Sequence, residues 1–152
     1  MRVNYTTYDV RRDNDIIRPQ RSNVMMLDPE RTATSTKAHT FCYAKVLAIF
    51  HANVFYMGQD NRDLHPRRIE FLWVRWYELK KVGSWVPQRL DELYFPSASN
   101  DDSFGFLDPA NVLRACHIIP SFRKDKVFSE GHAGFSCNAN DKNDWNVYFV
   151  NR

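Results

Sequence analysis

The sequence contains too few cysteines, too widely spaced, to build a disulfide scaffold or a zinc site. Three are present: Cys42, Cys116 and Cys137. A disulfide framework uses an even number of cysteines, and a structural zinc site uses closely spaced pairs. We therefore expect three reduced thiols in an intracellular protein, located in the nucleus or the cytoplasm.

Long apolar runs are also missing. The N-terminus, Met-Arg-Val-Asn-Tyr-Thr-Thr-Tyr, has no apolar core of the kind that a signal peptide carries. Nowhere does the chain approach the ~20 consecutive apolar residues that a membrane-spanning helix needs. We expect no signal peptide and no membrane partner.

Motifs for enzymatic chemistry are absent from the sequence as well. There is no glycine-rich phosphate loop and no Gly-x-Ser-x-Gly turn around a nucleophilic serine. Cys116 and Cys137 have no base at a spacing typical of a catalytic pair. We expect a protein without enzymatic activity, without a cofactor and without a bound metal.

One segment leaves an enzymatic origin open. Residues 117–120, His-Ile-Ile-Pro, resemble the first histidine segment of fungal HNH-type nucleases, in which a histidine activates water beside a metal. The resemblance implies metal ligands downstream, for which His132 and Asn143 are the reasonable candidates. Neither belongs to a pattern with a helix that carries a second histidine. We therefore interpret His117 as a strand residue at the seam of a barrel, with a nuclease remnant as the alternative.

Charges of the two signs are nearly balanced. The chain has 21 Lys and Arg against 18 Asp and Glu, a net charge of +3, which is too small to indicate a nucleic-acid-binding protein by itself. The arginines do form two clusters, one near the N-terminus and one in a later loop: Arg11, Arg12, Arg18 and Arg21, then Arg62, Arg67 and Arg68. We interpret them as solvated surface, because acidic residues interleave with them. A basic face that binds nucleic acid is the alternative.

Aromatic residues are what the sequence has in abundance, and they are most concentrated in residues 69–78, Ile-Glu-Phe-Leu-Trp-Val-Arg-Trp-Tyr-Glu. Aromatic and branched side chains without Gly or Pro predict a central β-strand. Alternation puts Phe71, Trp73 and Tyr77 on one face, with Leu72 and Trp76 on the other. Both faces are apolar, so we expect both to be covered.

Other segments predict further strands, and the chain as a whole predicts a mainly β protein. Strand-like composition recurs at residues 3–10, 24–27, 41–56, 90–95 and 116–119. We expect the longest of these to bend near residues 51–53, and the polar residues 58–68 to form the loop of a hairpin that leads into the central strand. Asp108 and Pro109 predict the start of a short helix, with Asp108 as its N-cap. Val112 and Leu113 would face inward from it.

The C-terminal part has a different composition. Residues 121–144 are polar, with Gly131 and Gly134 among them, and predict irregular structure. Residues 145–150 are apolar again. We therefore place a barrel domain at residues 1–120 and an irregular C-terminal extension, shortened at its end, at residues 121–152.

The order of these segments resembles the bromo-adjacent homology (BAH) domain. The residues that carry the resemblance are Tyr-Ala-Lys-Val-Leu-Ala-Ile-Phe (43–50), Leu-Trp-Val-Arg-Trp-Tyr (72–77), Asp-Glu-Leu-Tyr-Phe (91–95) and Val-Leu-Arg-Ala-Cys-His-Ile (112–118). It covers roughly residues 15–120. The resemblance implies a single bent β-barrel of the SH3-like or BAH-like kind, with long loops and one or two short helices. It also implies a non-enzymatic module that binds chromatin proteins.

The whole chain also resembles a protein family without an established activity, repeated many times in mushroom-forming fungi and often encoded beside transposon genes. Three segments carry this second resemblance: residues 5–12, 71–76 and 104–109. Members of that family continue past Arg152, which implies that this chain is a shortened copy. The partner that the two resemblances imply is a histone tail or a transposon-associated protein.

Some BAH domains hold a methylated lysine in a cage of aromatic side chains, through cation–π attraction of about 0.5–2 kcal/mol per contact. The residues of this chain that could form an aromatic groove of that kind are Tyr56, Trp73, Tyr77, Glu78 and Tyr94. Trp76 is expected in the core instead. Arg75, within the same strand, needs an acidic partner if it is buried, for which Asp91, Glu92, Glu70 and Glu78 are the candidates.

Overall fold

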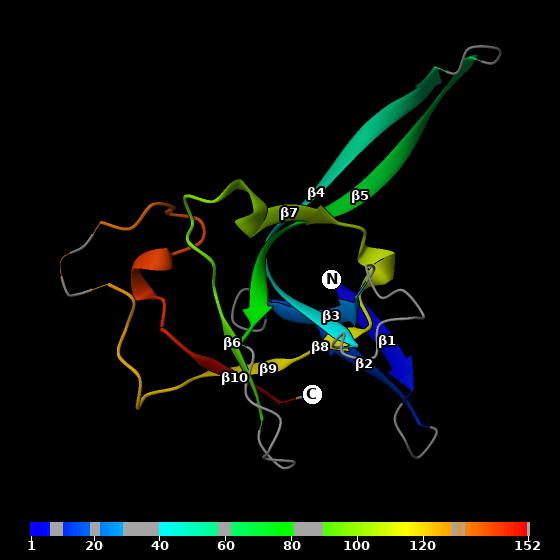
Figure 1. The fold of residues 1–152 in the computed structure, drawn as a ribbon. Helices are drawn as coiled ribbons and strands as arrows, with labels where there is room; N and C mark the ends of the chain where they lie inside the picture. The colour runs from blue at the N-terminus through cyan, green and yellow to red at the C-terminus, as the bar shows by residue number, and fades with distance from the viewer. Residues whose placement is uncertain are drawn as a thin grey trace, which may run out of the picture.

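Strands form most of the protein in the computed structural model, which describes residues 1–6, 11–18, 22–28, 40–57, 62–80, 90–128, 131 and 133–151 (Figure 1). In chain order the strands are β1 (Arg2–Thr6), β2 (Arg12–Ile16), β3 (Asn23–Leu27), β4 (Phe41–Met57), β5 (Arg62–Leu79), β6 (Asp91–Tyr94), β7 (Phe104–Leu107), β8 (Arg114–Ala115), β9 (His117–Pro120) and β10 (Tyr148–Asn151). Three short 3-10 turns accompany them: η1 (Asp101–Ser103), η2 (Pro109–Asn111) and η3 (Asp141–Asn143). The prediction of a mainly β protein is confirmed.

The main sheet curves into a nearly closed barrel. Its strand order is β8-β3-β4-β5-β6-β10-β9, and the two end strands are consecutive in the chain, separated by Cys116 alone. β7 pairs with β5 outside this order, and β1 and β2 form a separate hairpin. The predicted β-barrel is therefore present, and its seam lies between β8 and β9.

β5 is the central strand that the aromatic residues predict. It pairs antiparallel with β4, with Tyr77 opposite Tyr43 and Arg75 opposite Lys45. An extra residue on β4 shifts the register between Val46 and Ala48, so that Ala48 stands opposite Trp73. This bulge lies nearer the start of β4 than the bend that we expected at residues 51–53.

Where β5 crosses the barrel, both of its faces are covered, as predicted, by two separate apolar clusters, whereas Ile69, nearer the arm, is half exposed. One cluster takes residues from six strands of the barrel and therefore fills its interior; we call it the barrel core: Met25, Tyr43, Tyr77, Leu93, Ile118, Tyr148 and Val150. The other lies on the opposite face of β3, β4 and β5 and is covered by the N-terminal hairpin and by residues around β7. Its members are Val3, Ile17, Val24, Met26, Ala44, Val46, Leu72, Val74, Leu107 and Val112, and Trp76 packs against them as expected.

The C-terminal segment is not only an irregular extension. Residues 121–144 contain no named strand among those that the structure describes, in agreement with the prediction. β10, however, lies between β6 and β9, where Tyr148 pairs with both Leu93 and Pro120. A boundary at residue 120 therefore divides the barrel sheet. The cause is long-range pairing, which the local composition of residues 121–152 does not reveal.

β4 and β5 continue well past the barrel as a two-stranded arm (Figure 1). We define the arm as residues 49–57 of β4 and 62–71 of β5. Residues 62–68, which we predicted to be loop, are strand and pair with β4 up to Met57 opposite Arg62. The polar side chains of this segment mark an exposed strand, because pairing with β4 satisfies the backbone whatever the side chains are.

The predicted helix start at Asp108 is confirmed, although only one 3-10 turn follows. Asp108 Oδ1 accepts a hydrogen bond from the Ala110 amide at 2.8 Å, which is the geometry of an N-cap. Val112 is buried after this turn, while Leu113 is exposed.

We predict that the protein loses stability at alkaline pH, because two tyrosines are buried in the barrel core. Burial raises the pKa of Tyr148 to about 12 and raises the pKa of Tyr77 well above its ordinary range. The folded state favours the neutral phenols, so their stabilising contribution is complete below about pH 10, the pKa in the unfolded chain, and is lost as the pH rises toward 12. Urea midpoints at pH 7, 9 and 11 should fall steeply between the last two. The urea midpoint of Tyr148→Phe should fall less between pH 9 and pH 11. An equally large fall in this variant would show that Tyr148 does not cause the alkaline loss of stability.

Candidate interaction surface

The base of the arm carries a cluster of three aromatic rings, of which two are exposed and one is partly buried. Phe50 on β4, Phe71 on β5 and Phe106 on β7 come from three neighbouring strands. The rings of Phe50 and Phe71 are 5.8 Å apart, and those of Phe71 and Phe106 are 5.4 Å apart with their planes nearly perpendicular. Phe106 is 70% exposed and Phe50 is 44% exposed. We call these three residues the aromatic patch.

Strand pairing explains why the three rings meet. Phe50 stands directly opposite Phe71, and Phe106 stands opposite Trp73, so all three side chains project from the same face of the sheet. The face continues toward the barrel with Trp73, whose ring lies 6.0 Å from that of Phe104. It continues toward the arm tip with Ile69, which is half exposed.

A glycine allows β7 to approach β5 closely enough for this arrangement. A Cβ atom at Gly105 would lie 2.6 Å from Trp76 Nε1, closer than such atoms approach in folded proteins. Any side chain here would displace the indole or β7 itself. Gly105 therefore sets the position of Phe106 within the patch.

The structure does not bring the predicted groove residues together. Tyr77 lies in the barrel core, stacks on Phe95 at 3.9 Å and donates a hydrogen bond to Asn23. Tyr56 is exposed on the arm, and Trp73 is half-buried. Tyr94 donates a hydrogen bond to Glu78, which stands opposite it on β5, and this bond raises the pKa of Tyr94. Of the five, Tyr94 and Glu78 are hydrogen-bonded to each other.

We expected the face of β5 that carries Trp73 and Tyr77 to line a groove. At Tyr77 this face points into the barrel instead. The sequence contained a signal for the patch, because Phe71 was assigned to the correct face of β5. Phe50 and Phe106 were missed, since their places depend on the register of β4 and on the pairing of β7.

The two arginine clusters lie on different parts of the molecule. Arg12 is in β2, in the hairpin at one end, and Arg67 and Arg68 are in the arm, which extends from the other side of the barrel (Figure 1). Arg68 makes an exposed ion pair with Glu70 at 3.0 Å. Arg11 and Arg18 are exposed near β2. Arg21 lies outside the described residues, and Arg62 is placed only through its backbone in β5.

Two of the residues proposed for a nuclease remnant, His117 and Asn143, lie in the described part of the chain. His117 is exposed at the start of β9, opposite Asn151. Asn143 donates a hydrogen bond to Asn140, and His132 lies outside the described residues. Within the part of the chain that the structure describes, no three His, Cys, Asp or Glu side chains gather in a way that could hold a metal. In the same part, no helix has the length and apolar character to cross a membrane.

Arg75 is buried and has an acidic partner, but not one that the sequence suggested. Its Nη1 lies 2.7 Å from Asp144 Oδ2, its Nη2 donates to the Pro96 carbonyl at 3.2 Å, and its Cζ lies 4.0 Å from the Phe95 ring centre. The expected ion pair is therefore present, and the predicted partners are corrected to Asp144. Burial raises the pKa of Asp144, and Arg75 opposes that shift.

Lys45 stands beside this pair and helps to fix the C-terminal segment. It lies opposite Arg75 on β4, and its Nζ donates to the Ala139 carbonyl at 3.3 Å. Burial lowers the pKa of Lys45, while Asp144 acts against the shift. Asp141 accepts backbone hydrogen bonds from Phe135 and Ser136 at 2.7 and 2.9 Å. These contacts attach residues 135–144 to the central strands and indicate a structural role.

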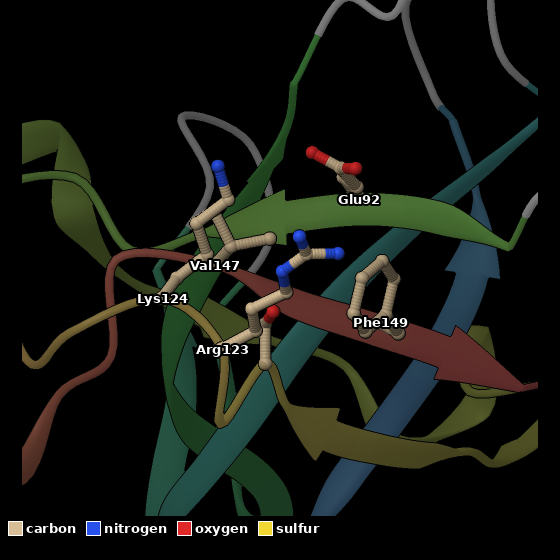
Figure 2. A pocket seen from close by; sticks show the side chains of 6 residues that line it. Glu92, Arg123, Lys124, Val147 and Phe149 are labelled. Carbon is tan, nitrogen blue, oxygen red and sulfur yellow. The ribbon is translucent and has the colours of Figure 1, made fainter.

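A shallow pocket of about 370 Å³ lies on the outside of the barrel, over β6 and β10. Glu92, Ser121, Arg123, Lys124, Val147 and Phe149 line it. Figure 2 shows the Arg123 side chain reaching over β10, with its guanidinium in the space between Glu92 and Phe149. Arg123 and Lys124 are exposed cations of this pocket, and Val147, which also lines it, is buried and apolar.

No protein-family model matches this chain, and neither a curated protein nor a solved structure matches it.

Proposed function

We propose that this protein is a non-enzymatic protein-interaction module that binds its partner through the aromatic patch. The observation that carries the proposal is a row of three phenylalanine rings on one sheet face, in which Phe71 packs against both Phe50 and Phe106, and Phe106 is 70% exposed. Aromatic side chains are enriched at the energetic centres of protein interfaces, because they bury a large apolar area in a fixed orientation. Clustered exposed apolar side chains mark interaction sites, whereas single ones do not.

Charge favours a protein partner over nucleic acid at this surface. Residues 49–71 contain three arginines and three acidic residues, so the arm and its base have no formal net charge. A phosphate backbone is bound by an excess of cations, and its affinity depends on their number. Of the N-terminal arginine cluster, Arg12 lies in β2, away from the arm, and does not add to this face (Figure 1).

The class of partner within this proposal follows from the BAH resemblance. A chromatin protein, and a histone tail in particular, is the partner that the resemblance implies, and the mainly β barrel is compatible with it. An extended tail could lie along β7 at the base of the arm, with an apolar side chain on the aromatic patch.

Titration of histone-tail peptides, methylated and unmethylated, tests the proposal by isothermal calorimetry. We expect at least one tail to bind, and Phe106→Ser to weaken its affinity by about tenfold or more, as loss of an interface hot spot does. Phe122→Ser is the matched control, because Phe122 is 75% exposed and its ring packs edge-on against another aromatic ring, that of Trp145.

The control variant should bind as the unchanged protein does. If no tail binds, the chromatin partner is excluded. If both phenylalanine variants bind equally well, or lose binding equally, the aromatic patch is not the docking surface.

A further inference from the structure

The two strands of the arm differ in the protection of their free edges. Residues 62–70 of β5 include three arginines, two acids and Pro66, and the register with β4 shifts across the Pro66 region. Charges, proline and irregular pairing are the features by which sheet edges avoid pairing with other chains. Residues 49–57 of β4, Ile-Phe-His-Ala-Asn-Val-Phe-Tyr-Met, contain no Lys, Arg, Asp, Glu, Pro or Gly.

This unprotected segment is exposed. Ile49, Phe55, Tyr56 and Met57 are each 50–67% exposed. Pairing between β3 and β4 ends at Lys45. Beyond it, the Val46 amide donates a backbone hydrogen bond to the Ser22 carbonyl. Among the described strands, residues 49–57 pair with β5 alone, so half of their backbone groups point away from any strand.

We propose that this β4 edge pairs with the same edge of a second copy of the chain, antiparallel and centred on Asn53. The two arms then form a four-stranded sheet in the order β5-β4-β4-β5, across a two-fold axis. Phe50 stands opposite Tyr56 of the second copy, Ala52 opposite Val54, and Ile49 opposite Met57. Apolar side chains face apolar side chains along the seam, and Asn53 faces its own copy at the axis.

The distribution of charge supports a second copy as the occupant. No like charges meet at the seam, because the β4 segment has none, and the charged β5 strands lie at the two outer edges of the joined sheet. A two-stranded ribbon is marginally stable in water by itself, and pairing removes both unprotected edges. The register of the arm shifts between Val54 and Tyr56 because β5 has additional residues there, whereas β4 runs through this region without a bulge. β4 can therefore pair with a second strand along its whole length in the arm.

Sedimentation velocity over a range of protein concentrations tests this inference. We expect a monomer–dimer equilibrium that Asn53→Asp weakens by about tenfold or more, because two carboxylates then face each other at the axis. Within its own chain, Asp at position 53 stands opposite Arg68 across the arm. This pair of opposite charges should make the hairpin itself more stable rather than less stable.

Two further measurements distinguish the seam from a general loss of structure. An equimolar mixture of Asn53→Asp and Asn53→Lys chains should form dimers again, because opposite charges then meet. His65→Asp places the same charge on the β5 edge and should leave the dimer unchanged. A protein that is monomeric at every concentration, or a dimer that Asn53→Asp does not weaken, would overturn the proposal.

Discussion

A chain that ends at Pro120 is expected not to fold. Such a fragment contains the whole segment that the sequence predicts to be the barrel domain, but it lacks β10. β10 supplies Tyr148 and Val150 to the barrel core and pairs with β6 on one side and β9 on the other. Without it the barrel would have two additional open edges and a gap in its interior.

The size of the loss follows from what residues 121–152 bury. Tyr148, Val150 and Val147 are all buried, and full burial of an apolar side chain contributes about 1.5–3 kcal/mol. The fragment would also leave Arg75 without Asp144, at a cost of about 3–5 kcal/mol for an unpaired buried charge. These contributions together reach the 5–15 kcal/mol that is the whole stability of an ordinary domain.

Circular dichroism with urea denaturation tests this prediction on residues 1–120 and 1–152. We expect a cooperative transition for the longer chain and none for the shorter one. Removal of Arg152 alone is the control and should leave the transition in place. A cooperative transition of the 1–120 fragment would show that the barrel closes without β10 and would restore the division that the sequence suggested.

The elements that could be predicted are those whose own residues determine their structure. The segment 69–78 is dense in aromatic and branched side chains and has no breaker, so it forms a strand whatever its partners are. Asp108 followed by Pro109 begins a helical turn by local hydrogen bonding, and the short strands β3 and β6 lie within one residue of their predicted bounds. Alternation also placed Trp76 correctly on the face of β5 that carries Leu72 and Val74, where it packs against their apolar cluster.

The elements that could not be predicted depend on partners distant in sequence. Residues 62–68 are polar and were assigned to a loop, yet they form a strand because β4 extends beside them. The aromatic patch requires β7 to pair with β5, which no pattern within residues 104–107 indicates. For Arg75 the nearby acids were the natural candidates, while the actual partner lies 69 positions further along the chain, in a segment without regular strands.

Arg75→Met is expected to destabilise the protein by about 3–5 kcal/mol. Arg75 is 1% exposed, and its guanidinium is held by Asp144, by the Pro96 carbonyl and by the face of Phe95. Methionine fills much of the same volume, so the loss would come from charge rather than from a cavity. It leaves Asp144 buried without its nearest cation, and burial already disfavours the charged form of that carboxyl.

Arg68→Met is a control in the same strand with the same change of side chain. Arg68 also makes an ion pair, with Glu70 at 3.0 Å, but both side chains are more than half exposed. Exposed pairs contribute about 1 kcal/mol or less, so this variant should unfold near the urea midpoint of the unchanged protein. The contrast between the two arginines therefore measures the effect of burial on the same interaction.

The double variant Arg75→Met and Asp144→Asn separates the loss of attraction from the cost of an unpaired charge. If the cost arises from the uncompensated carboxylate, removing that charge should recover part of the stability, because buried ion pairs are often replaced without loss by neutral groups of similar size. Urea denaturation of the two single variants and the double variant completes the cycle. A double variant as unstable as the sum of the singles would mean that Arg75 stabilises the protein through Phe95 and Pro96, and that Asp144 acts independently of it.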